Sequence, residues 1–276
     1  MRRRKKYLKR LNIGRDLKFM QNHNVKIQEI IKITKKAGDI AMQLYDKKYS
    51  IEQKQNKTPV TEAVIAINDF LMDELAKYNY PILSEEVRDD FKKRKNVDFV
   101  WIIDPLDGTT DFIQKTGEFS IMIGLINKKG ESILGVVYAP ALDELYYAQK
   151  NKDAYICHLG QDLRSLQKLQ VSKKPIKNGK ILVSRSHLKK YEQEITKKYN
   201  MRQISAGSAG LKICWIARGD AELYINSSDK SGLWDICAAD IILAEAGGKI
   251  IDKNGNEILY NIEDVMLQNG YVISNK

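Results

Sequence analysis

Residues 99–111 read FVWIIDPLDGTTD, a run of five apolar residues followed by eight that include three aspartates, a proline and a glycine. The apolar run predicts a buried β-strand, with the aspartates where that strand ends. Acids crowded at a strand end repel one another unless a cation neutralises them. Oxygen ligands with no nearby His or Cys suit a hard ion such as Mg²⁺. A polar turn, with Asp as a cap and Gly as a helix stop, is the alternative.

The backbone of this segment has two features that favour the metal interpretation. Pro105 fixes φ and lacks an N–H, which lets the chain turn and present the Leu106 carbonyl beside Asp104 and Asp107. Gly108 lets backbone N–H groups approach a phosphate, and a following helical turn would add its positive end. The segment is therefore predicted to supply both cation ligands and anion donors.

Two other segments place acids where they would complete such a site. Residues 82–86 (ILSEE) end a short strand with paired glutamates, and residues 233–240 (LWDICAAD) open an apolar helix that runs to AGG at 246–248. Separately, each has an ordinary explanation as a Glu-rich helix start or a helix cap. Together with Asp104 and Asp107, they predict a site that Glu85 and Asp235 complete.

The surrounding pattern predicts two halves. In residues 25–150, helices at about 25–48 and 58–77 precede an antiparallel sheet. The expected strands are Ile82-Leu83, 99–103, 119–126, 133–138 and 145–148, with a turn at 128–130. In residues 151–276, strand-like and helical segments alternate, which favours an α/β half. Its expected strands are 181–183, 221–225 and 249–251, and its expected helices are about 187–199, 208–218 and 233–246.

Charge and composition limit the class of protein. Of the net charge of +11, residues 1–19 carry +8, so the rest of the chain has only +3 and nucleic acid is not an expected partner. We interpret residues 1–24 as a basic, disordered extension. A start-site artefact, a targeting segment and a contact with anionic lipid or RNA are the alternatives. Three scattered cysteines predict no disulfide framework, and no apolar run is long enough to span a membrane.

The three acidic segments together resemble one family. Glu-Glu after a short strand, then DPLDGTTDF, then WDxxAAD ending in AGG is similar to the inositol monophosphatase superfamily of Mg²⁺-dependent phosphatases, from about residue 25 to the C-terminus. Residues 117–120 (GEFS), 133–140 (ILGVVYAP) and 184–187 (SRSH) resemble its 3'(2'),5'-bisphosphate nucleotidases, the CysQ type. The resemblance implies a layered αβαβα fold that combines α+β and α/β parts.

The resemblance also implies roles for individual residues. Glu85, Asp104 and the Leu106 carbonyl would hold one Mg²⁺, and Asp104, Asp107 and Asp235 a second; a weaker third ion is left open. The N–H groups of Gly108 and Thr109 would contact phosphoryl oxygens, and the Thr109 hydroxyl would orient the attacking water. The substrate is expected to contact Glu85, Leu106, Asp107, Gly108, Thr109, Ser184, His187, Ser208, Lys212 and Asp235. Lys212 would meet a second phosphate, although His187 and Lys212 also fit ordinary surface residues.

Two positions depart from the family pattern. Residues 60–64 read VTEAV, so Val64 stands where the family usually has the Asp that partners the water-orienting Thr. Glu62 cannot replace it, because residues two apart on a helix point in different directions. Our hypothesis is that Glu86 takes over water positioning. Thr110 is the second departure, since the nucleotidases commonly have Lys there and G-T-T is more typical of inositol monophosphatases.

The function predicted from the sequence is removal of the 3'-phosphate of adenosine 3',5'-bisphosphate, giving AMP and phosphate. An inositol-1-phosphate or fructose-1,6-bisphosphate phosphatase is one alternative. A catalytically weakened homologue that binds a nucleotide or metal is the other. We expect a phosphorylated nucleotide as the partner, a monomer or homodimer, and a cytoplasmic location or peripheral attachment to the inner face of the membrane.

Overall fold

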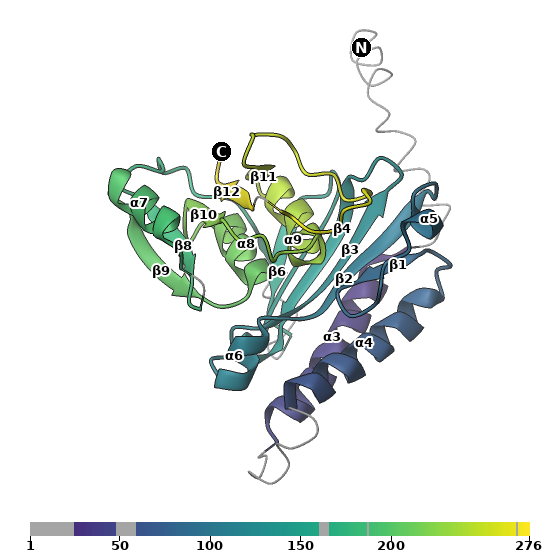
Figure 1. The fold of residues 1–276 in the computed structure, drawn as a ribbon. Helices are drawn as coiled ribbons and strands as arrows, with labels where there is room; N and C mark the ends of the chain where they lie inside the picture. Colours follow the sequence, from purple (N-terminus) through teal and green to yellow (C-terminus); the bar gives the residue numbers. More distant parts are fainter. Residues whose placement is uncertain (1–24, 48–58, 160–165, 187, 269) are drawn as a thin grey trace.

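The computed structural model describes residues 25–47, 59–159, 166–186, 188–268 and 270–276. The predicted basic extension and His187 lie outside these residues. The described elements stack in layers: a helix pair, a seven-stranded sheet, a second helix pair, a five-stranded sheet and an outer helix (Figure 1). The predicted αβαβα arrangement is therefore present.

The first layer is the pair of helices α3 (Ile27–Tyr45) and α4 (Pro59–Ala76), which pack against each other. On α3, Ile30, Ile33 and Ala37 are buried at a spacing of three and four residues, as the sequence predicts. This apolar stripe faces the first sheet, and both helices cover the same face of it (Figure 1).

The first sheet has its strands in chain order. They are β1 (Ile82–Ser84), β2 (Phe99–Asp107), β3 (Ser120–Asn127), β4 (Ser132–Ala139), β5 (Glu144–Gln149), β6 (Ala154–Cys157) and β7 (Gln167–Lys168). Neighbouring strands are antiparallel except β1 and β2, which are parallel, so the prediction of an antiparallel sheet is wrong for this pair. The connection from β1 to β2 contains the short helix α5 (Phe91–Arg94), and such a crossover permits parallel pairing.

The sheet also continues past residue 150, where the sequence predicted a boundary between halves. Strand β6 pairs with β5, and β7 pairs with β6. Neither strand was predicted, because β6 spans only four residues and β7 only two polar ones. Two short elements flank the sheet: helix α6 (Thr109–Gln114) after β2 and the 3₁₀ helix η2 (Pro140–Leu142) after β4.

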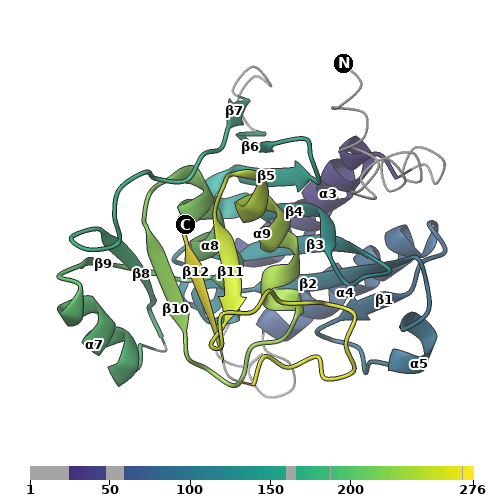
Figure 2. The same ribbon diagram turned by 90° about the horizontal axis from the view of Figure 1, so that it is seen from above.

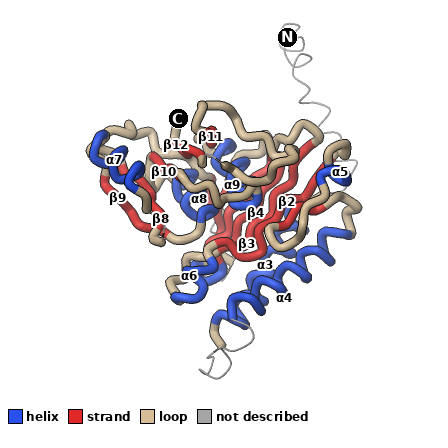
Figure 3. Tube along the Cα trace, in the orientation of Figure 1, coloured by secondary structure: helices blue, strands red, loops and turns tan. Residues whose placement is uncertain are grey.

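The second sheet has the order β11-β12-β10-β8-β9 and belongs to the predicted α/β half. Its elements are β8 (Lys180–Ser184), α7 (Lys190–Lys198), β9 (Arg202–Ala206), α8 (Ala209–Arg218), β10 (Leu223–Asn226), α9 (Trp234–Glu245), β11 (Lys249–Asp252) and β12 (Tyr271–Ser274). The alternation of helix and strand is visible in Figure 3. Seen from above, β10, β11 and β12 lie over α8 and α9 (Figure 2).

Helix α9 is covered on two sides, by the first sheet and by β11, and this explains why it is apolar all round. It lies very close to the first sheet because Gly124 and Gly135 face each other on β3 and β4. A Cβ on Gly135 would come within 1.9 Å of the Ala238 carbonyl oxygen. The two glycines thereby fix the position of the helix whose first turn includes Asp235.

All three cysteines are buried, and none forms a disulfide. Within the described ranges, no helix has both the length and the apolar character that crossing a bilayer requires.

Candidate metal and phosphate site

The end of β2 contains a β-bulge that brings Asp104 and Asp107 to the same side. Asp104 pairs with Met122 and Asp107 with Ser120, so β2 has one residue more than β3 in this interval. Strand residues three apart normally point to opposite faces of a sheet, and one inserted residue reverses this. Pro105 lies inside the bulge, where its missing N–H is tolerated. Both aspartates therefore line the same cavity.

Three carboxylates converge at this cavity from distant parts of the chain. Glu85 follows β1, Asp104 lies in β2, and Asp235 lies in the first turn of α9. One carboxylate oxygen from each lies within 4.8 Å of the others. We call Glu85, Asp104 and Asp235 the acid group.

The acid group is electrostatically unfavourable without a counter-ion. Burial raises the pKa of Glu85 to about 7, and the charge of Glu86 adds to the shift. Burial raises the pKa of Asp104 well above its usual value, and the charge of Glu85 raises it further. The pKa of Asp235 is raised by the same two effects, burial and neighbouring acids, of which Asp107 is the strongest. Such mutual shifts in a cavity make the acid group a candidate functional site.

The donor set fits a hard divalent cation. Asp104 is 1% exposed, and its Oδ2 atom has no hydrogen-bond partner in the part of the chain that the structure describes. Its Oδ1 accepts a hydrogen bond from the Leu106 N–H at 2.9 Å. A buried charged oxygen without a partner is costly unless it coordinates a metal. Because the three side chains offer only carboxylate oxygens, the ion that fits best is Mg²⁺.

Asp107 is held differently from the acid group. Its Oδ2 accepts hydrogen bonds from the Ser208 hydroxyl and from the Gly210 N–H, the latter at 2.8 Å. Ser208 caps α8, where its hydroxyl also accepts a hydrogen bond from the Leu211 N–H at 3.1 Å. The N-terminus of α8 thus fixes the orientation of the Asp107 carboxylate.

Gly108 and Thr109 follow directly and begin helix α6. Gly108 has a φ of 89°, and a Cβ there would lie 2.9 Å from the Glu118 carbonyl oxygen, so both conformation and space require glycine. Thr109 is exposed, and both residues line the cavity.

The cavity has a volume of about 260 Å³ and is lined by most of the residues predicted to contact metal or substrate. These residues are Glu85, Asp104, Leu106, Asp107, Gly108, Thr109, Ser184, Ser208, Lys212 and Asp235. Glu86 is exposed beside Glu85 and is not among the described residues that line the cavity. The role of Glu86 in water positioning stays a prediction.

Two residues predicted to touch the substrate also have partners within the protein. Ser208 is 2% exposed, with its hydroxyl 3.0 Å from that of Ser120 in addition to its bond to Asp107. Lys212 is equally buried, and its ammonium group donates to the carbonyl oxygens of Gly207 and Ser208, the latter at 3.0 Å. Burial lowers the pKa of Lys212 to about 8, while the nearby acids, led by Asp107, oppose this shift.

Val64 lies in the apolar core between α3, α4 and the first sheet, where it is 9% exposed. It is not one of the described residues that line the cavity. The position at which the resemblance led us to expect a carboxylate is therefore occupied by a packed apolar side chain.

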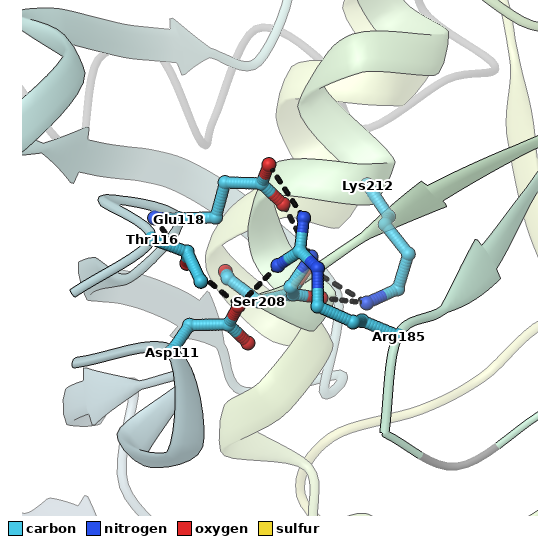
Figure 4. Close-up of polar contacts among 7 residues, drawn as sticks. Asp111, Thr116, Glu118, Arg185, Ser208 and Lys212 are labelled. Atoms are coloured by element: carbon cyan, nitrogen blue, oxygen red, sulfur yellow. Dashed lines mark hydrogen bonds and ion pairs between the residues drawn. The ribbon is translucent and has the colours of Figure 1, made fainter. Parts of the chain in front are cut away.

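The residues that sequence reasoning missed form a second charged group beside the cavity (Figure 4). Arg185 donates to Asp111 and Glu118, and we call these three residues the ion cluster. Each belongs to a motif with family resemblance, but the pairing joins residues 67 or more positions apart. Spacing along the sequence therefore gave no indication of it.

Comparison with known proteins shows the family of the chain. Residues 23–276 match the model of the inositol monophosphatase family. The chain belongs to that family. Among its curated relatives, the 3'(2'),5'-bisphosphate nucleotidase CysQ of Aggregatibacter actinomycetemcomitans is 34% identical, over 90% of this chain and 91% of the relative. That of Shigella flexneri is 32% identical, over 90% of this chain and 99% of the relative.

A solved structure of the same family has a closely similar fold. It is the crystal structure of CysQ from Bacteroides thetaiotaomicron, described as a bacterial member of the inositol monophosphatase family. It is 29% identical to this chain with a TM-score of 0.80, and the alignment covers 94% of this chain and 99% of that one. The family membership predicted from the three acidic segments is confirmed.

Proposed function

We propose that this protein is a Mg²⁺-dependent 3'(2'),5'-bisphosphate nucleotidase that converts adenosine 3',5'-bisphosphate to AMP and phosphate. The observation that carries the proposal is the convergence of Glu85, Asp104 and Asp235 within 4.8 Å beside a cavity that also contains Asp107 and Thr109. The nucleotide specificity is supported by the CysQ nucleotidases that match over 90% of the chain.

In this proposal, Glu85, Asp104 and the Leu106 carbonyl would hold one Mg²⁺, and Asp104, Asp107 and Asp235 would hold a second. Bound Mg²⁺ supplies Lewis-acid chemistry to the phosphoryl group and to the attacking water. The N–H groups of Gly108 and Thr109 bind phosphoryl oxygens, and the Thr109 hydroxyl orients the water for in-line attack.

The second phosphate of the substrate requires a cation that is accessible from the cavity. Two lysines are among the described residues that line it: Lys212, which is buried, and Lys230, which is exposed. The segment that carries Lys230 is held in place, because the Asn226 side chain donates to Ser231 at 2.8 Å and the Ser228 hydroxyl accepts from the Lys230 N–H at 3.2 Å. We assign Lys230 to the second phosphate together with Lys212.

An inositol phosphate phosphatase is the second candidate, and Thr110 is the observation that favours it. Thr110 lines the cavity at the position where the nucleotidases commonly have Lys. Initial rates on adenosine 3',5'-bisphosphate, inositol-1-phosphate and fructose-1,6-bisphosphate distinguish the candidates. The proposal expects the highest kcat/KM for the nucleotide and a large loss in Asp107→Asn. A higher kcat/KM for either sugar or inositol phosphate would overturn the substrate assignment.

A further inference from the structure

Arg185 joins the two halves of the protein beside the cavity (Figure 4). It follows β8, and its backbone N–H donates to the Ala206 carbonyl of β9 at 3.0 Å. From there its guanidinium reaches the other half, donating through Nη1 to Asp111 of α6 and through Nη2 to Glu118 at 2.8 Å. One planar guanidinium thus binds two acids through two separate nitrogens, in a fixed geometry that a lysine ammonium does not have.

Glu118 continues this contact toward the proposed metal ligand Asp107. Its Oε2 accepts a hydrogen bond from the Gly207 N–H at 2.6 Å, and its backbone carbonyl accepts one from the Ser208 N–H at 3.1 Å. Ser208 in turn donates its hydroxyl to Asp107. Arg185 is therefore connected to Asp107 through Glu118 and the turn at residues 207–208.

Asp111 connects the same arginine to the start of α6. It is 4% exposed and also accepts a hydrogen bond from the Thr116 hydroxyl at 2.7 Å. It lies two residues after Thr109 in α6, so its ion pair with Arg185 restrains the short helix that begins at Thr109. A Cβ on Gly207 would lie 2.6 Å from the Asp111 carboxylate, so the ion cluster and the turn are in close contact.

The position of Arg185 relative to the cavity indicates an indirect role. Its neighbours Ser184 and Ser186 line the cavity, whereas Arg185 is not among the described lining residues. The two terminal nitrogens of Arg185, Nη1 and Nη2, each form an ion pair with an acid of the protein.

We propose that Arg185 is a positioning residue for the phosphatase reaction, which holds Asp107 and Thr109 in place through Glu118 and Asp111. It also couples them to the end of β8, where Ser184 is proposed to contact the nucleotide. The inference rests on the proposed function, because it concerns the geometry of that same site.

The test compares wild type with Arg185→Met, Arg185→Lys and the matched control Arg218→Met. Arg218 ends α8 and also binds two acids, Glu144 at 2.7 Å and Asp220 at 2.6 Å, with a side chain 25% exposed against 30% for Arg185. It is not among the described residues of the cavity. Both Met variants thus lose an arginine that is paired with two acids, but only Arg185 is connected to Asp107 and Thr109.

We expect kcat of Arg185→Met to fall by about 10–100-fold with KM changed by less than about threefold, because interactions behind metal ligands have effects of this size. The Mg²⁺ concentration for half-maximal activity rises in the same variant. Arg185→Lys recovers part of kcat, and Arg218→Met keeps the wild-type kcat. A raised KM with unchanged kcat would assign Arg185 to the substrate instead. Equal kcat in the two Met variants would reduce it to a structural residue.

Hydrogen exchange separates this inference from the proposed function. The Gly207 N–H donates to Glu118, so its exchange should be faster in Arg185→Met than in wild type and unchanged in Arg218→Met. If the wild-type protein hydrolyses none of the three substrates, the proposed function fails, while the exchange result still reports whether Arg185 holds the turn. Unchanged exchange in Arg185→Met overturns the inference by itself.

Discussion

The acid group and the ion cluster lie at the same cavity, but only the acids of the ion cluster are paired with a positively charged side chain. In the acid group, Glu85, Asp104 and Asp235 face one another, and their pKa values are raised by burial and by mutual repulsion. In the ion cluster, Asp111 and Glu118 share the guanidinium of Arg185. The difference supports the proposal that the first group binds an external cation, whereas the second group connects segments of the protein.

Asp104→Asn should have the largest effect and should separate activity from stability. Loss of the central carboxylate lowers phosphatase activity by about 10³-fold, the upper range for loss of one charge-stabilising group. The same change removes a buried carboxyl group whose pKa is raised. Because such a group destabilises the folded state at pH 8, the metal-free protein becomes more stable without it. Rate assays and thermal unfolding in chelator measure the two effects. A lower Tm for Asp104→Asn would contradict the account of the acid group.

Asp111→Asn should change stability in the opposite direction. The substitution leaves Arg185 with a weaker partner inside a packed cluster, and we expect a loss of about 2 kcal/mol, reduced from the value for a fully buried pair because Arg185 is partly exposed. Chemical denaturation measures this loss. If Asp104→Asn and Asp111→Asn shift stability in the same direction, the contrast between the two groups is wrong.

These contrasts show how far the sequence could predict the molecule. Asp104, Asp107, Glu85 and Asp235 could be predicted because each acid stands at the end of an apolar strand or the start of an apolar helix. The ion pair of Arg185 with Asp111 spans 74 residues and depends on how the second sheet packs against α6. Similarly, β7 is a pair of polar residues whose strand conformation comes only from pairing with β6.

The pH dependence of Mg²⁺ binding tests whether the acid group carries the protons that its pKa values imply. The pKa of Glu85 is raised to about 7 in the metal-free protein, so below pH 7 a proton must leave before the ion binds. We expect Mg²⁺ affinity to fall by about tenfold per pH unit below 7, with proton release on binding. Calorimetry in two buffers of different ionisation enthalpy counts these protons. Affinity that stays constant from pH 8 to pH 6 would contradict the raised pKa.

Lys230→Met should have the smallest effect and tests the exposed lysine that lines the cavity. Because Lys230 is exposed, its contact with a phosphate is worth about 1 kcal/mol, or about a fivefold rise in KM for adenosine 3',5'-bisphosphate. The KM for 3'-AMP, which lacks the second phosphate, should stay constant. Equal changes in KM for both nucleotides would remove Lys230 from the second phosphate site.

The most direct test of the central claim is the initial rate of phosphate release from adenosine 3',5'-bisphosphate as Mg²⁺ is added to chelator-treated protein. The account predicts no release without the metal and a saturable rise with it, with AMP as the nucleotide product. Release that is independent of Mg²⁺, or no release at any Mg²⁺ concentration, would contradict the assignment of Glu85, Asp104 and Asp235 to a catalytic metal site.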